Sequence, residues 1–221
     1  AHGLLIWQQP HPIYFAEMDY RLHPTQETLD KWKDVVLNSA QYMADYAHYD
    51  AANDRYVLGP PVVIVSENTA ALKTVNPIFE LGYWRYGLRT AQQWRERLGM
   101  PREPQWDTVL NKLSPLPIQD SVYVTYEGIP DMWTKYTFEH PALTGVFGML
   151  PGDGVDTTVY RRTLDKVNRE WQSDRIWGWD FPMMAMGAAR SGNPELAIDM
   201  LMHNSKQFRF DEHGLASGGP W

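Results

Sequence analysis

The stretch DFPMMAMGAARSGNPELAIDML, residues 180–201, sets the pattern for the chain because it holds two helices with almost nothing between them. Pro182 is tolerated only in the first turn of a helix, where its missing N–H is not needed, so we expect Asp180 at or near the N-cap. Gly192 ends this helix, and Asn193 caps the next one. A connection this short predicts a pair of packed helices.

Further helices are expected upstream of this pair, and each has apolar residues recurring every three or four positions. Two of them are long, and the apolar stripe of the second includes Leu81, Trp84 and Leu88. The expected boundaries are a cap at Thr25, a start at Asn76-Pro77 with an end at Gly99, a shorter helix from about 103 to 113, and a cap at Asp156.

The remaining segments are expected to be connections. Residues 4–20 contain Pro10 and Pro12 close together and are predicted to be irregular. Residues 56–66 are predicted to form a loop with some strand character, and residues 117–154 a long loop with a short extended piece. No Val/Ile-rich strands alternate with the helices, which argues against a parallel α/β sheet. The sequence therefore predicts an all-α fold resembling about half of an (α/α) toroid of helical hairpins, with the long connections building a site at one end.

Composition supports one sizeable domain over residues 1–221, which we expect to be a piece of a longer protein because both ends look cut. Aromatic residues make up 13% of the chain, so some rings are expected to line a cleft, where carbohydrates can stack on them. The net charge is −7 and no basic run occurs, which argues against a nucleic-acid partner. No apolar run is long enough to predict a membrane span, and the absence of Cys excludes disulfides. The compartment is left open, with a periplasmic or extracellular location slightly favoured.

The stretch RIWGWDFP, residues 175–182, carries the clearest chemical signal. Trp177 and Trp179 are suited to stack on a sugar, and Asp180 lies beside them. An acid at a helix N-terminus faces the positive end of the helix dipole and is expected to stay ionised near neutral pH, as a general base requires. The alternative is that Asp180 only caps its helix, and the sequence leaves both readings open.

Glycoside hydrolysis needs a second carboxyl group, about 6.5–9.5 Å from the first when configuration inverts. Glu67 is the main candidate for the general acid, because it follows an apolar β-branched run that would half-desolvate it and raise its pKa. Glu80 is a rival near an apolar stripe, although such a residue commonly complements its own helix dipole. Glu17 is a third carboxylate, suited to hydrogen-bond sugar hydroxyls. Glu67 as an ordinary surface residue remains the alternative.

The histidines have no spacing typical of a metal site, so we expect no metal and no cofactor. His11 and His140 each precede a proline and are expected to bond sugar hydroxyls or loop backbone. Residues 152–154 form a turn without the full pattern of a phosphate loop, and no Ser lies in a nucleophile elbow.

Four motifs together resemble the six-hairpin glycosidase superfamily, with bacterial proteins akin to glycoside hydrolase families 65 and 95 as the nearest kin. They are Gln8-Gln9-Pro10-His11-Pro12, Gly59-Pro60-Pro61 followed by Ser66-Glu67-Asn68, Asn76-Pro77-Ile78-Phe79-Glu80-Leu81, and Trp177-Gly178-Trp179-Asp180-Phe181-Pro182. The resemblance implies the C-terminal part of a six-hairpin catalytic toroid and an inverting mechanism. Those families carry a β-sandwich before the toroid, and none is expected in this sequence.

The resemblance also assigns roles to residues. Ser66-Glu67 matches the Ser-Pro-Glu setting of the general acid in the fucosidase branch, without the proline. The phosphorylase branch has Asp-Glu almost directly after Gly-Pro, whereas Pro61 and valines follow here, which weakens the case for phosphorolysis. Asp180 matches the general position of the base. Substrate contacts are predicted for Gln9, His11, Glu17, Glu80, Trp177 and Trp179.

The sequence therefore predicts a glycosidase whose partner is a carbohydrate substrate. A glycoside phosphorylase on the same fold and a non-catalytic carbohydrate-binding protein are the alternatives. No nucleic-acid or membrane partner is expected. If part of a toroid is missing, apolar faces such as the Trp84 stripe would be partly bared, and the chain could then associate with itself.

Overall fold

The computed structural model describes residues 3–216, and about half of the chain is helical. Within residues 3–216, four short strands form two antiparallel hairpins, β1 with β2 and β3 with β4. The elements are α1 (His11–Leu22), α2 (Gln26–Tyr46), β1 (His48–Asp50), β2 (Arg55–Val57), α3 (Ile78–Arg97), α4 (Pro104–Lys112), β3 (Ile118–Gln119), β4 (Val122–Tyr123), α5 (Met132–Lys135), α6 (Ala142–Gly148), α7 (Thr157–Glu170), α8 (Asp180–Arg190) and α9 (Pro194–Leu201).

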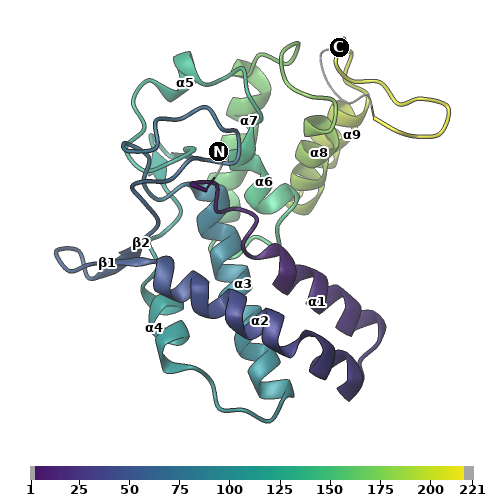
Figure 1. Cartoon of the computed structure of the whole chain (residues 1–221). Coiled ribbons are helices and arrows are strands. Elements are labelled where there is room, and N and C mark those ends of the chain that lie inside the picture. The colour runs from purple at the N-terminus through teal and green to yellow at the C-terminus, as the bar shows by residue number, and fades with distance from the viewer. Residues whose placement is uncertain (1–2, 217–221) are drawn as a thin grey trace.

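Helix α3 runs through the middle of the molecule and is buried along most of its length (Figure 1). Helices α1 and α2 pack on each other and on α3, and α4 contacts α2 and α3. On its other flank α3 contacts α6, which packs against α8, and α9 packs outside α8. One large cluster of buried side chains joins these layers. The predicted helix-rich character is confirmed, and it is compatible with an all-α fold.

Three predicted caps are confirmed by their hydrogen bonds. Thr25 accepts a bond from the N–H of residue 28 at 3.2 Å, and Asn193 accepts one from residue 196 at 3.1 Å. Asp156 accepts from the N–H groups of residues 158 and 159 at 2.7 and 3.0 Å. Each cap satisfies N–H groups that have no partner inside the helix. Local side-chain chemistry therefore fixes where α2, α7 and α9 begin.

Two segments that the sequence predicts to be irregular contain helices. Helix α1 begins at His11, because Pro12 falls in its first turn, where proline is tolerated. The long connection 117–154 contains the short helices α5 and α6. Helix α6 is nearly all buried, with Leu143 and Val146 fully enclosed. Tertiary packing stabilises a helix of this length, which is too short to be stable alone.

The expectation that the Trp84 stripe is partly bared is wrong. Trp84 is 0% exposed, and its indole N–H donates to the carbonyl of Met43 at 2.9 Å. Exposed apolar side chains lie elsewhere. Those on α1, on the α8–α9 pair and on the residue after it include Phe15, Leu22, Met186, Ile198 and Met202. Among residues 3–216, no helix combines the length and apolar character needed to cross a bilayer.

Helices α6 and α8 approach closely because glycine lies at their contact. A Cβ added to Gly148 would collide with the backbone carbonyl oxygen of Met183, and one added to Gly145 would lie 3.2 Å from the Met183 sulfur. A side chain can rotate away from such a contact, but a backbone carbonyl inside a helix is fixed. The spacing between α6 and α8 therefore depends on Gly148.

Replacing Gly148 with Ala should lower the free energy of unfolding by about 1–3 kcal/mol, the usual cost of overpacking a core. Helix propensity alone would give the opposite sign, since Ala is favoured over Gly by about 1 kcal/mol. Urea denaturation measures the difference. Asn38→Ala, at an exposed position of α2, is the control and should change stability by less than about 0.5 kcal/mol. A Gly148→Ala protein as stable as the wild type would contradict this packing.

Candidate active site

Asp180 is the first residue of α8, next to the observed N-cap Trp179 and so near the cap as predicted, and its side chain is wholly buried. Its two oxygens lie 3.1 and 3.0 Å from Nδ1 of His140, and Oδ2 also accepts a bond from the N–H of Trp177 at 2.9 Å. Burial raises the pKa of Asp180, and the contacts with His140 and Trp177 oppose that rise. Desolvation therefore changes the pKa of Asp180 more than the contacts with His140 and Trp177 do.

His140 lies two positions before α6 and joins the Asp180 carboxylate to the protein surface. Its side chain is 20% exposed, and its ring centroid is 4.5 Å from that of Trp179 and 5.5 Å from that of Trp177. The sequence prediction placed His140 at a sugar hydroxyl or loop backbone, and its pairing with Asp180 was missed. A His-Pro dipeptide preceding a helix was the available signal.

A pocket of about 360 Å³ opens against this histidine, and we call it the aromatic pocket. Trp179 and His140 form part of its wall, Trp7 comes from the N-terminal segment, and Phe79 comes from the start of α3. Trp179 is 38% exposed, so its ring is open to a ligand. The described lining residues are Trp7, Val65, Phe79, His140, Ala142, Met149, Trp179 and Met183.

Glu67 lies on the loop that borders the same region. Val65 lines the aromatic pocket, and Ser66 donates a hydrogen bond to the carbonyl oxygen of His140 at 3.3 Å. Glu67 follows with a left-handed backbone, φ 59°, and its side chain is exposed rather than half-desolvated. It is not one of the described residues that line the pocket. The structure thus brings the two predicted catalytic loops together at His140, with one carboxylate outside the pocket and the other buried behind it.

His11 and Gln9 support the wall of the aromatic pocket. Nδ1 of His11 lies 2.7 Å from the hydroxyl of Tyr83, and its ring packs edge-on against Trp7 with centroids 5.1 Å apart. Burial lowers the pKa of His11. Gln9 is half-buried in the turn between Trp7 and α1, where its backbone N–H donates to Ile6. The His11 ring therefore supports the Trp7 ring, whereas Gln9 contributes through the backbone turn that follows Trp7.

Glu17 has a structural environment away from the pocket. Its side chain is 2% exposed, and its oxygens accept hydrogen bonds from Arg97, Arg21 and the indole N–H of Trp94. Burial raises its pKa, but the hydrogen bonds from these three residues outweigh it and hold the pKa below its ordinary value. A carboxylate bound by three donors inside the core has no free face for a sugar, so Glu17 ties α1 to α3.

Glu80 is also buried, but its carboxyl oxygens have no hydrogen-bond partner among the described residues. It lies in the first turn of α3, near the backbone of Val65. Burial raises the pKa of Glu80 to about 8, against weaker effects from nearby backbone N–H groups. At neutral pH this group is therefore mostly a neutral acid.

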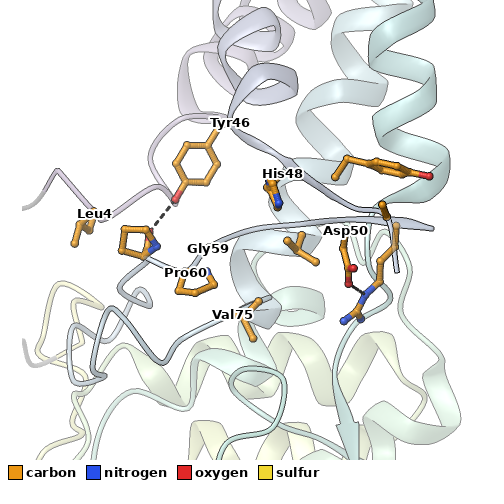
Figure 2. A pocket seen from close by; sticks show the side chains of 12 residues that line it. Leu4, Tyr46, His48, Asp50, Gly59, Pro60 and Val75 are labelled. Atoms are coloured by element: carbon orange, nitrogen blue, oxygen red, sulfur yellow. Dashed lines mark hydrogen bonds and ion pairs between the residues drawn. The ribbon is translucent and has the colours of Figure 1, made fainter. Parts of the chain in front are cut away.

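A larger pocket, of about 800 Å³, lies elsewhere (Figure 2). The end of α2, the β1–β2 hairpin and residues 59–61 surround it. Tyr46 donates to the carbonyl of Pro61 at 3.2 Å, and Asp50 pairs with Arg55 at 3.4 Å. No predicted site residue lines this pocket. Its charged groups are already paired, so the aromatic pocket is the better candidate for chemistry despite its smaller volume.

Neither the known protein-family models nor the curated protein sequences match this chain. Residues 3–216 contain no group of three or more His, Cys, Asp or Glu side chains placed to hold a metal ion. The case for function therefore depends on the geometry of the aromatic pocket and its neighbouring carboxylates.

Replacing Glu80 with Gln should flatten the pH dependence of stability. Its folded-state pKa of about 8 lies above the ordinary value of 4.5. Between these values the unfolded chain has lost the proton that the folded protein keeps, so the free energy of unfolding falls as pH rises. In the wild type, ionisation of Glu80 should lower the free energy of unfolding by up to about 5 kcal/mol as pH rises between these two pKa values. The figure corresponds to about 1.4 kcal/mol per pKa unit.

Urea denaturation between pH 5 and pH 8.5 measures this slope in both proteins. Glu27→Gln changes an exposed glutamate in the first turn of α2 and is the matched control, because it should keep the wild-type slope. Equal slopes in the wild type and Glu80→Gln would show that Glu80 ionises normally in the folded protein.

Proposed function

We propose that this protein is a glycoside hydrolase that binds a sugar in the aromatic pocket. The observation that supports this most strongly is the meeting of three features: aromatic walls, the His140–Asp180 pair, and the loop that carries Glu67. A volume of about 360 Å³ lies within the usual range for small-molecule sites, about 300–1,000 Å³. Mostly apolar walls with a few polar groups are typical of such sites.

The aromatic walls suit a carbohydrate because a pyranose ring has apolar C–H faces and polar edges. The exposed ring of Trp179 offers a stacking surface, with Trp7 and Phe79 as further walls. His140 supplies a polar group at the same wall. This arrangement needs no net positive charge, which agrees with the acidic balance of the chain.

Hydrolysis with inversion needs a proton donor on one side of the glycosidic bond and a base for water on the other. We assign Glu67 as the proton donor and place the base on the side of Asp180. Glu80 is the rival donor, because its pKa of about 8 keeps it protonated at neutral pH, but it is sealed from solvent. Glu67 is exposed on the loop beside the pocket, so a proton donor at this position needs no opening of the core.

The helix packing supports the finer proposal that the chain is an arc of an (α/α) toroid. Helices α1, α3, α6 and α8 contact one another in series and would form the inner layer. Helices α2, α7 and α9 pack against members of this row and would form the outer layer. In this arrangement the aromatic pocket lies at the end where α3, α6 and α8 begin.

Non-catalytic carbohydrate binding is the second candidate, because the complete burial of Asp180 suits a structural carboxylate as well as a catalytic one. The walls of Trp7 and Trp179 would bind sugar in either case. Loss of turnover without loss of binding separates the two functions. Added phosphate tests the phosphorylase alternative, since only phosphorolysis depends on it.

The chain should hydrolyse at least one member of a panel of α- and β-linked disaccharides. Glu67→Gln and Asp180→Asn should each lower kcat by about 100- to 10,000-fold, the usual contribution of acid–base catalysis, while sugar binding persists. Trp179→Ala should instead weaken binding, because it removes the stacking ring. Reducing-sugar release measures turnover and calorimetry measures binding.

Glu27→Gln is the control for these charge changes and should leave turnover unchanged. Glu80→Gln tests the rival donor: if it abolishes turnover and Glu67→Gln does not, the acid is Glu80. A wild-type protein that binds sugars but hydrolyses none would support the binding function and contradict the hydrolase.

A further inference from the structure

The Asp180 carboxylate cannot touch a substrate in this structure. Its side chain is 0% exposed, and both oxygens are engaged by Nδ1 of His140, with one also bound by the N–H of Trp177. A base must lie within hydrogen-bond reach of the proton that it removes, directly or through one water molecule. The negative charge of Asp180 can therefore act on the pocket only through a neighbouring group.

His140 is that neighbour. It lines the aromatic pocket, and its side chain keeps 20% exposure. Nδ1 faces Asp180, whereas Nε2 has no hydrogen-bond partner among the described residues and is not sealed in the interior. One ring nitrogen is thus bound to the buried carboxylate, and the other is left for a ligand.

Packing restricts the orientation of the His140 ring. Trp179 and Trp177 contact it, with ring centroids 4.5 and 5.5 Å away. The Ser66 hydroxyl donates a hydrogen bond to the carbonyl oxygen of His140, and Pro141 follows His140 in the chain. A fixed imidazole whose Nδ1–H donates to a carboxylate keeps the tautomer in which Nε2 carries a lone pair. This tautomer is the one that accepts a proton from water.

We propose that His140 is the catalytic base of this site and that Asp180 is a positioning residue that orients and charges it. The inference deepens the proposed hydrolase function and rests on it. Nε2 of His140 removes a proton from water as the water oxygen bonds to the anomeric carbon. The glycosidic C–O bond breaks, and its electron pair takes the proton of Glu67. The imidazolium then releases its proton to solvent, Glu67 regains one, and the sum is one water added across the bond.

Substitution of His140 tests its role in turnover. His140→Ala should lower kcat by about 100- to 10,000-fold while KM changes by less than about tenfold, and added imidazole should restore part of kcat by filling the gap. A merely structural histidine would not give rescue by imidazole. His48→Ala is the matched control, because His48 is exposed in the other pocket and should leave turnover unchanged.

The tautomer provides a second readout that needs no substrate. Nitrogen NMR of ¹⁵N-histidine-labelled protein should show His140 protonated at Nδ1 in the wild type, and Asp180→Asn should abolish this preference. A His140 protonated at Nε2 in the free protein would overturn the inference, because that nitrogen would have no lone pair for water.

The outcomes separate the inference from the function on which it rests. If the wild type is active and His140→Ala is equally active, His140 is not the base, but the proposed hydrolase function stands. Asp180 would then act directly on water after a local opening of the structure. A wild type that hydrolyses no glycoside would remove both. Loss of kcat in His140→Ala with imidazole rescue and the Nδ1–H tautomer would support both.

Discussion

The close packing of α6 on α8 is the contact on which the candidate site depends. Gly148 lets the backbone of α6 approach the carbonyl of Met183 in α8, a distance that any larger residue would widen. His140 lies two positions before the first residue of α6, and Asp180 is the first residue of α8. Bringing these two helices together therefore brings an imidazole and a carboxylate within hydrogen-bond distance, although 40 positions separate them in the chain.

Three buried glutamate and aspartate side chains show how partners decide the behaviour of a carboxyl group. Glu17 has two arginines and an indole N–H, and these keep its pKa low despite burial. Asp180 has one histidine and one backbone N–H, and burial still raises its pKa. Glu80 has no hydrogen-bond partner among the described residues, and its pKa rises to about 8. Only a structure distinguishes these residues, because the local sequence does not show which distant groups will meet each carboxyl group.

Much of the helical framework could be predicted from local residue patterns. Thr25, Asp156 and Asn193 cap helices as expected, because the capping bond spans only two or three positions. Helix α6 was missed because its stability comes from burial between α3 and α8 rather than from a capping or periodic signal of its own. The burial of Trp84 was missed for a related reason: α2 covers it, and a stripe of apolar residues does not show which element will meet it.

The sequence by itself determined the helix-rich class, the starts of the capped helices and the gathering of Trp177, Trp179 and Asp180 in one stretch, since these depend on neighbours within a few residues. Only the tertiary structure decided which acids are enclosed and which ring stands between Asp180 and the pocket. Those outcomes depend on contacts between residues such as Glu17 and Arg97, 80 positions apart, and the free energy of burying a charge depends on the whole surroundings of that charge.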